Sequence, residues 1–438
     1  MQTDRWGVVM AAPPGAPLDP FDDAVRSLCL MRGQPSAELD QLSNAHGDWA
    51  LVEIFRAYLD LYAQTPEGNE LAAERLLLHG EDQSTWGDRE RAHHGAALAW
   101  GAGDLVDALS VLAEWVTVEP RDLLALRVTQ DLAFFLGDQD ALLSLPARAL
   151  PSWAPTKPDR GLVLGMAAFG LEEHGEFRDA EELARAALAI DPTDAWSTHA
   201  LAHVMEMEGR SAEGVDFLRS SAPSWSPSFF ASHNWWHLAL FLLELDDTDG
   251  AIELLHGPIS AAGSAVWFEI VNQASLLWRL MLVGADPGPP SPDLLSVLAE
   301  RSEQTLSVFN ALHAVAALSI GGQAEAVESI VRSYRSMNPS GTEALLLEGF
   351  AAFGAAEFEV AARSLTVARA GAASIGGSNA QRDLIDQTLL LATVRSGGSR
   401  SVIDELIDAH PFRWSQATTA KLTQRPETGD DGPLRPEG

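Results

Sequence analysis

The chain has 438 residues, of which 46% are apolar and 21% are charged, a composition typical of globular rather than disordered proteins. Its 62 acidic residues against 29 basic ones give a net charge of −33, which repels phosphate backbones and anionic lipid. Neither nucleic acid nor a membrane surface is therefore an expected partner. The single cysteine, Cys29, excludes an intramolecular disulfide and a cysteine-based zinc site.

Residues 1–45 are expected to form an N-terminal extension that contains a helix. The first residues lack the basic start and the apolar run of a signal peptide, and no window of the chain reaches about 18 consecutive apolar residues. These features predict a cytoplasmic protein. Cys29 lies in the apolar run SLCLMRG and is expected to be a small buried residue.

Residues 46–415 show a helical repeat. Segments 48–64 and 69–80 have apolar residues at helical spacing and predict a first helix pair. Segments 103–120 and 175–192 share one layout, in which a glycine turn is followed five positions later by a small residue and a proline closes the segment. This layout resembles the second half of a tetratricopeptide repeat. The small-residue position recurs at Ala108, Leu142, Ala180, Gly214, Ala251, Ala326 and Ala361.

The spacing of this marker fixes the expected fold class. Successive steps are 34, 38, 34, 37, 75 and 35 residues, as a 34-residue helix–turn–helix unit predicts if one unit within the step of 75 has lost its turn signature. That unit contains the proline-rich stretch 284–290. We expect an all-α, tetratricopeptide-like α-α superhelical solenoid of eight or nine helix pairs. Residues 416–438 are expected to be a disordered acidic, proline-rich tail.

Seven of the 12 histidines lie in the first helices of predicted pairs, which line the inner surface of such arrays. His199 and His203 are four residues apart, and so are His233 and His237, so the two rings of each pair lie on one face of their helix. Glu206 follows His203 by about one helical turn. Neutral imidazoles at this spacing can chelate a metal ion, so we consider a zinc, iron or manganese site. Its candidate ligands are His199, His203, Glu206, His233 and His237. The remaining three histidines are His93, His94 and His313.

Two other interpretations of the histidines stay open. They can be core residues bonded to neighbouring carbonyl groups, or they can line a metal-free pocket for a polar ligand. Trp235 and Trp236 point about 100° apart on a helix, so at least one is expected in the core. Trp236 is retained as a ligand-binding candidate. The catalytic candidates are His94, His199, His237, His313 and the inward-facing Asp131.

A glycine-rich turn precedes a predicted helix near the C-terminus, in the sequence GGSNAQRD at residues 376–383. Such a turn can hold an anion with its backbone N–H groups, with Arg382 adding a bidentate contact. An ordinary helix start capped by Ser378 or Asn379 explains the same residues and is favoured locally. Arg382 and Asp383 are kept as ligand-binding candidates. The sequence contains no P-loop, nucleophile elbow or HExxH motif.

The segments 88–94, 169–210, 229–244, 309–314 and 376–383, taken together, resemble the tetratricopeptide repeat protein 38 family, and the most specific matches are HNWWH and THALAHV. The resemblance runs from about Trp49 to Trp414 and is loose at the N-terminus and around residues 262–292. It implies a tetratricopeptide-like superhelix and a cytosolic protein, and little about activity. The matching site positions include all seven histidines named above, together with Trp236, Gln381, Arg382 and Asp383.

The sequence supports three hypotheses about function. The first is a binding protein that holds a small polar molecule or a peptide in a pocket lined by histidine and tryptophan. The second is an enzyme that uses the histidines as metal ligands or as general acid–base groups. The third is an interaction scaffold whose histidines are structural. The ligand, any reaction and the oligomeric state are left open.

Overall fold

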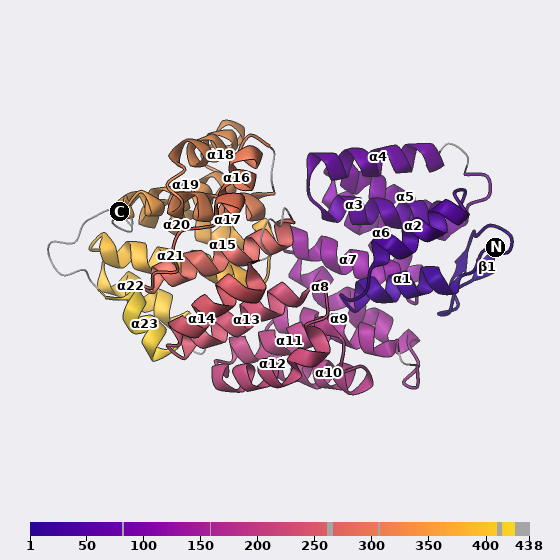
Figure 1. The fold of residues 1–438 in the computed structure, drawn as a ribbon, viewed down its shortest axis with the longest axis horizontal. Coiled ribbons are helices and arrows are strands. Elements are labelled where there is room, and N and C mark those ends of the chain that lie inside the picture. Colours follow the sequence, from indigo (N-terminus) through magenta and orange to yellow (C-terminus); the bar gives the residue numbers. More distant parts are fainter. Residues whose placement is uncertain (81–82, 158, 261–265, 305–306, 410–413, 425–438) are drawn as a thin grey trace. The chain divides into compact units, whose positions relative to one another are not determined.

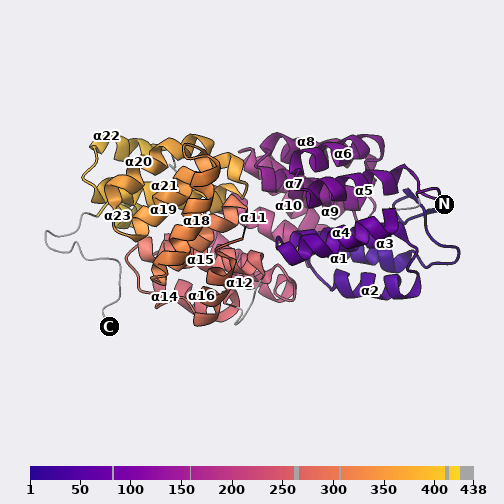
Figure 2. The ribbon, with the colours of Figure 1, turned by 90° about the horizontal axis from the view of Figure 1, so that it is seen from above.

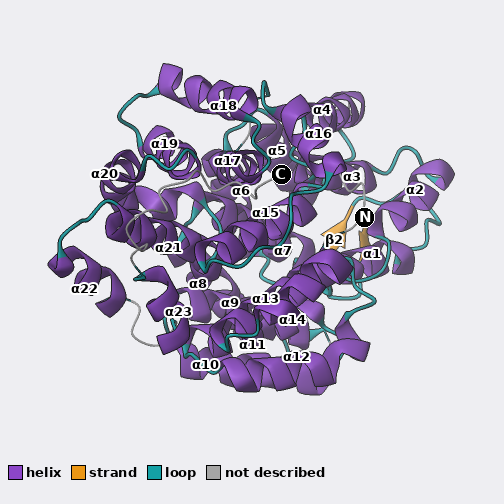
Figure 3. Ribbon diagram, turned by 60° about the vertical axis from the view of Figure 1, so that its left-hand side comes forward, coloured by secondary structure: helices purple, strands orange, loops and turns teal. Residues whose placement is uncertain are grey.

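The computed structural model describes residues 1–80, 83–157, 159–260, 266–304, 307–409 and 414–424. Within these residues the chain is almost entirely helical, and Figure 3 shows one short strand pair beside the N-terminus. The antiparallel strands are β1 (Gln2–Thr3) and β2 (Val9–Met10), with Gln2 opposite Met10. The prediction of an all-α fold is confirmed. The strand pair was not expected, because two-residue strands leave no alternating pattern in the sequence.

The chain forms two compact units. The first takes in Met1–Val204 and Ser221–Ala231, and the second takes in Met205–Ser220 and the residues from Ser232 onward. Figure 1 labels their helices. The first eleven helices are α1 (Asp19–Cys29), α2 (Pro35–Ala45), α3 (Ala50–Tyr62), α4 (Pro66–Gly80), α5 (Asp88–Gly101), α6 (Leu105–Val118), α7 (Leu123–Leu136), α8 (Gln139–Ala149), α9 (Arg160–Glu173), α10 (Phe177–Ile190) and α11 (Ala195–Met207).

The helices that follow vary in length, from 7 residues in α14 to 17 in α21. They are α12 (Ser211–Trp225), α13 (Ala231–Glu244), α14 (Thr248–Leu254), α15 (Trp267–Leu282), α16 (Pro292–Arg301), α17 (Val308–Ile320), α18 (Ala324–Met337), α19 (Thr342–Gly354), α20 (Phe358–Ala368), α21 (Asn379–Arg395), α22 (Arg400–Asp408) and α23 (Gln416–Leu422). Short 3-10 or π turns occupy Leu150–Ser152, Leu255–Ile259 and Arg369–Ile375.

Packing within each unit follows the tetratricopeptide layout. In the first unit α3 packs on α4 and on α5, and Figure 2 shows α5 to α8 next to one another. In the second unit the first helices α15, α17 and α19 pack successively, and α18 and α20 pack against α17 and α19. The described helices α1 to α22 make eleven consecutive pairs, so the expected number of eight or nine was too low. A helix was expected in the N-terminal extension and another after residue 379, but α1/α2 and α21/α22 were not predicted as repeat pairs because they lack the repeat marker.

The marker residues allow close approach of neighbouring helices. Ala108 and Ala180 are fully buried, and the glycines that begin these segments, Gly103 and Gly175, have positive φ angles of 84° and 88°. Glycine adopts this left-handed conformation at no steric cost. At Gly214 a Cβ atom would lie 2.4 Å from the ring of Phe241. At Ala108, Ala180 and Gly214 close helix contact therefore favours a small residue, whereas α8 accommodates Leu142 at the same position.

Several expectations outside the repeat also have structural outcomes. Cys29 is buried, as expected, and burial raises the pKa of its thiol well above the usual range. The repeat that was expected within the step of 75 residues, without a turn signature, corresponds to α15 and α16. In the segment expected to be disordered, residues 416–422 form α23, and residues 425–438 lie outside the described residues. Among the described helices, none combines the length and the apolar character needed to cross a bilayer.

Candidate functional site

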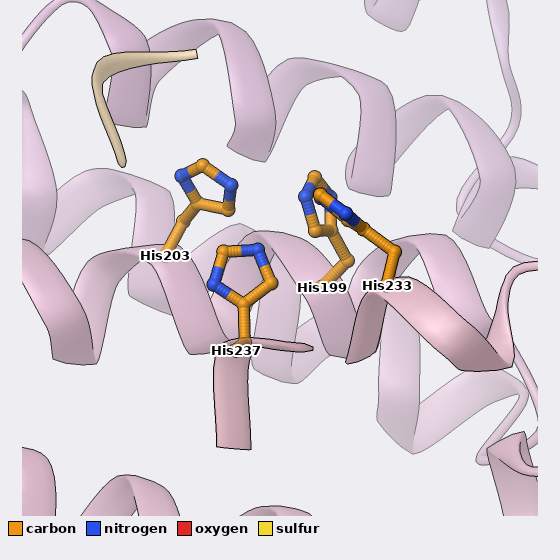
Figure 4. Close-up of side chains that lie close together, drawn as sticks. All are labelled: His199, His203, His233 and His237. Carbon is orange, nitrogen blue, oxygen red and sulfur yellow. The ribbon is translucent and has the colours of Figure 1, made fainter. Parts of the chain in front are cut away.

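Helices α11 and α13 bring four predicted site residues together. His199, His203, His233 and His237 each offer a ring nitrogen, and these four nitrogen atoms all lie within 4.8 Å of one another (Figure 4). Each side chain is at most 3% exposed. The two pairs share a helix face because their spacing of four residues is about one helical turn. We call these four residues the histidine cluster.

Aromatic side chains surround the α11 half of the histidine cluster. The ring centroids of His199 and His203 are 4.4 Å apart, and the ring of Phe169 lies 5.3 Å from the first and 5.4 Å from the second. Trp196 and Phe230 lie 5.0 Å and 5.1 Å from His199. These rings exclude water, which strengthens any electrostatic interaction made by the imidazoles.

Hydrogen bonds set the tautomers of the two α13 histidines. His237 Nδ1 lies 2.8 Å from Glu206 Oε2, and His233 Nδ1 lies 2.8 Å from Asn272 Oδ1. A carboxylate oxygen and an amide oxygen only accept hydrogen bonds, so each Nδ1 carries a proton and donates it. The lone pair of each neutral ring is then on Nε2. Metal-bound histidines have this arrangement, in which the second nitrogen donates to a carboxylate or carbonyl group.

Glu206 therefore has a different position from the one expected. The sequence suggested it as a metal ligand, whereas its carboxylate accepts the proton of His237 Nδ1. A carboxylate in this position orients the ring and raises its basicity. In this position the carboxylate holds the His237 ring through its Nδ1 proton.

Two carboxylates missed by the sequence analysis lie beside His203. Glu172 Oε2 and Glu173 Oε1 are 3.2 Å and 3.9 Å from His203 Nδ1, and the ligand atoms of these three residues lie within 4.8 Å of one another. Glu172 is fully buried and Glu173 is 3% exposed. Adjacent glutamates at the end of a helix resemble a solvated surface. The available signal was their place in α9, a first helix of the array.

The tryptophan pair divides between two environments. Trp236 is 1% exposed, stacks on His233 at a ring distance of 5.1 Å, and has the Arg279 guanidinium 5.4 Å from its ring centre. Trp235 is half-buried. Arg279 donates to the carbonyl oxygen of Ala380 at 2.7 Å, which fixes the cation over the indole. Trp236 is therefore a core residue whose ring also covers one face of the His233 imidazole.

His93 and His94 make hydrogen bonds within the first unit. His93 Nε2 lies 3.1 Å from Asp122, and its Nδ1 lies 3.2 Å from the hydroxyl group of Tyr58. Burial alone would raise the pKa of Asp122, but Arg89 and His93 outweigh it and hold that pKa well below its usual range. His94 Nε2 lies 3.0 Å from the carbonyl oxygen of Leu76. These contacts are typical of structural histidines.

Asp131 and His313 are also engaged by neighbouring groups. Asp131 pairs with Arg127 and accepts a hydrogen bond of 2.5 Å from Tyr62. His313 Nδ1 donates to the carbonyl oxygen of Phe309 at 2.8 Å. Burial lowers the pKa of His313 to about 4, so the ring is neutral at physiological pH. Its Nε2 has no hydrogen-bond partner among the described residues.

The glycine-rich turn before α21 is a capped helix start. Ser378 accepts a hydrogen bond from the backbone N–H of Gln381, and the Gln381 side chain bonds back in a capping box. Arg382 donates to the carbonyl oxygen of Gly377 and to Asn379. This arrangement agrees with the interpretation that the sequence favoured. Asp383, the next residue of α21, does not take part in this cap and accepts hydrogen bonds from Trp414 Nε1 and Gln387.

A small cavity in the second unit adjoins the carboxylate that supports His237. Its lining includes the carboxylates of Glu206, Glu244 and Asp383 and the guanidinium of Arg279. Burial raises the pKa of Glu244 to about 7, and the neighbouring charge of Asp383 adds to this effect. The Glu244 carboxyl group accepts a 2.6 Å hydrogen bond from the backbone N–H of Ser415. The cavity thus combines three carboxylates with apolar side chains, and Glu206 links it to His237 of the histidine cluster.

Comparisons with known proteins provide a distant likeness. No protein-family model matches the chain. The solved structure of the human IFIT1 dimer with m7Gppp-AAAA has 13% sequence identity and a TM-score of 0.34, with 96% of each chain covered. A monomeric mutant of IFIT1 with Gppp-AAAA has 14% identity and a TM-score of 0.32, with 92% of this chain and 93% of that one covered. These values are too low to support an inference about function.

The comparisons do correct one expectation. Nucleic acid was not expected as a partner because the chain is strongly acidic. The IFIT1 structures hold capped RNA oligonucleotides, so the exclusion was wrong as stated. Net charge is summed over the whole chain, whereas binding depends on the potential within one groove.

Proposed function

We propose that this protein is a tetratricopeptide-like metalloprotein that binds a divalent transition-metal ion at the histidine cluster. The observation that carries the proposal is the convergence of four buried ring nitrogens within 4.8 Å. Tetrahedral coordination at about 2.0–2.1 Å places ligand nitrogens about 3.4 Å apart, so small ring movements suffice to close the site. Imidazole donors favour zinc, copper, iron or nickel over calcium or magnesium.

Three features of the surroundings support a metal over a purely structural cluster. Two rings already have the tautomer that leaves Nε2 as the coordinating atom, because Glu206 and Asn272 accept their Nδ1 protons. Aromatic rings keep water out of the α11 half of the cluster. Three buried carboxylates, those of Glu172, Glu173 and Glu206, lie beside the cluster, and their negative charge attracts a divalent cation.

The proposal extends to the protein's wider role. The chain is proposed to belong to the tetratricopeptide repeat protein 38 family, to be cytoplasmic, and to carry its repeat array in residues 46–415. A small polar molecule or a peptide is the proposed ligand of the array, held beside the metal. If the protein is an enzyme, the ion would supply Lewis-acid chemistry or an activated water.

Metal binding can be tested on purified full-length protein stripped with a chelator and titrated with zinc by calorimetry. We expect tight, stoichiometric binding and a metal-dependent rise in melting temperature, since a ligand that binds only the native state stabilises it. His199→Ala and His237→Ala should each abolish tight binding. His174→Ala, at an exposed histidine on the C-cap of α9, is the matched control and should bind as wild type.

Two results would reject the metal proposal. One is the absence of stoichiometric binding of zinc, iron(II), cobalt or nickel by the wild-type chain. The other is binding that persists in both cluster variants. If the variants lower the melting temperature without any change in metal content, the histidines are core residues.

A further inference from the structure

We infer that a cleft on the first unit, between helix α4 and the turn that joins α2 to α3, binds a basic amphipathic helix of a partner protein. The cleft has a volume of about 280 Å³. It is lined by Ser43, Gly47, Glu53, Arg56, Leu71, Glu74, Arg75 and Leu78. All of these residues belong to the first unit, in which α3 packs on both α2 and α4 (Figure 2). None of them is part of the histidine cluster, so the inference does not depend on the proposed metal.

The sequence of α4 leaves an apolar stripe beside its packed face. Ala72 and Leu76, four residues apart, are buried where α4 packs on α3. Leu71 and Leu78 line the cleft instead, and they are 47% and 65% exposed. A single exposed leucine is common on a protein surface, whereas two that line one cleft offer a contact surface to a partner.

The spacing of these two leucines suits a helical partner. They are seven residues apart, which is about two helical turns and about 10.5 Å along the axis of α4. An amphipathic helix that lies in a groove presents apolar side chains at the same repeat of three, four and seven residues. Glu74 lies between the leucines on the same stripe, three residues after Leu71 and four before Leu78. The cleft therefore offers two apolar contacts with a carboxylate between them.

The arginines of the cleft are already paired with carboxylates of the first unit. Glu53 Oε2 lies 2.8 Å from Arg56 Nη1 and 3.3 Å from Arg75 Nη1, and the Glu53 side chain is only 4% exposed. The same guanidinium groups also pair with Asp40 at 2.7 Å and with Asp60 at 2.6 Å. Three carboxylates thus hold two arginines, so the arginines do not make the cleft an anion site.

Glu74 gives the cleft a surplus of negative charge. Its side chain is exposed and makes no ion pair within the part of the chain that the structure describes. With Glu74, four carboxylates face two guanidinium groups at this cleft. A lysine or arginine of the partner helix, placed between its apolar residues, would complement Glu74. The net charge of −33 also draws a basic segment toward the chain.

The same charge disfavours a second copy of this chain as the occupant. In a two-fold pair of identical chains, a surface meets the same surface of the other copy. Two such clefts would bring their surplus carboxylates together, and like charges at an interface oppose association. A partner with basic and apolar residues avoids this repulsion.

The test begins with random peptides of about 15 residues, which can form about four helical turns. They are displayed on phage and selected against the immobilised full-length protein. We expect the selected sequences to be enriched in lysine or arginine, together with leucine, isoleucine or phenylalanine at helical spacing. A synthetic peptide with the most enriched sequence is then titrated with the full-length protein by fluorescence anisotropy.

Substitutions on α4 place the bound peptide. Leu78→Glu should weaken its binding by about tenfold or more, because an apolar contact is lost and a charge replaces it. Leu77→Glu is the matched control, since it makes the same change at a neighbouring side chain that is 68% exposed and does not line the cleft. It should bind as wild type. Circular dichroism establishes that both variants are folded.

A charge reversal tests the choice of a basic partner. Glu74→Lys should weaken binding of the selected peptide. It should strengthen binding of a second peptide in which each lysine and arginine is replaced by glutamate. Zinc binding by Leu78→Glu and Glu74→Lys should equal that of wild type, so failure of this inference and failure of the metal proposal are distinguishable.

Three results would overturn the inference. The first is a selection that yields acidic or uncharged peptides, or no enriched sequence. The second is a selected peptide whose affinity is the same for Leu77→Glu and Leu78→Glu. The third is a wild-type dimer in analytical ultracentrifugation that Leu71→Glu dissociates, which would assign the cleft to a second copy of the chain.

Discussion

Replacing Glu206 with glutamine tests how the chain prepares its proposed metal ligand. The substitution keeps the side-chain size and an acceptor oxygen, and removes the negative charge that faces His237 Nδ1 at 2.8 Å. Glu206 is 7% exposed, so solvent screens this charge only weakly. Loss of such supporting carboxylates costs about 10–100-fold in metal affinity, which corresponds to about 1.4–2.7 kcal/mol. We expect Glu206→Gln to weaken zinc binding by this factor.

The assay is competition for zinc against a chromophoric chelator near neutral pH, with wild-type protein in parallel. Glu208→Gln is the control, because it makes the same change two residues further along the chain at an exposed position. Its affinity should equal that of wild type. Equal affinity of Glu206→Gln and wild type, or an equal loss in both variants, would refute the role given to the buried carboxylate.

Three further predictions concern packing, a buried ion pair and pH. Gly214→Ala should destabilise the chain by about 1–3 kcal/mol in chemical denaturation, since the new Cβ would displace the Phe241 ring that lies 2.4 Å away. Asp122→Asn should lower the unfolding free energy by about 3 kcal/mol, because it removes one of the two buried carboxylates, Asp122 and Asp4, that pair with the buried Arg89 guanidinium. Burial raises the pKa of Glu244 from 4.5 to about 7, so the unfolding free energy should fall as pH rises through this window, by about 3 kcal/mol at most, and Glu244→Gln should remove that slope.

Each of these has a result that would contradict it. An unchanged stability of the alanine variant would mean that the aromatic ring moves without cost. An asparagine variant as stable as wild type would show that the guanidinium finds other acceptors. A pH slope that persists in the glutamine variant would assign it to other buried carboxyls, such as Asp22 and Asp194, whose pKa burial also raises to about 6.

The repeat was predictable because its signal is local. Gly175 and Ala180 mark a turn and a close helix contact within a few residues, and the marker then recurs at a nearly fixed period. The terminal pairs α1/α2 and α21/α22 were not recognised as repeats for the same reason, although a helix was expected in each segment. They have helical periodicity but not the small-residue signature, since end units contact a neighbour on only one side.

The site was predictable in part. Helical spacing put His199 with His203 and His233 with His237, and these are the residues that meet. Spacing could not reveal that His93 belongs to an ion-pair network with Asp122, because that bond depends on residues from a following helix.

The contacts of the buried carboxylates also could not be predicted from sequence spacing. Glu172 and Glu173 have no spacing that relates them to the histidines, and only the packing of α9 places them beside His203. Glu206 was singled out by spacing, but spacing could not show that its carboxylate lies 2.8 Å from His237 Nδ1, because one further turn on a helix does not say which partner faces it. Sequence thus located residues on helix faces, and tertiary packing selected their partners.

X-ray absorption spectroscopy at the zinc edge, on the stoichiometric zinc complex, tests the central claim most directly. Its extended fine structure reports ligand type and distance. Four histidine nitrogens at about 2.0–2.1 Å, with the outer-shell scattering of imidazole rings, are the result that a four-histidine site predicts. A first shell made only of oxygen atoms, with no imidazole scattering, would contradict the assignment of the metal to His199, His203, His233 and His237.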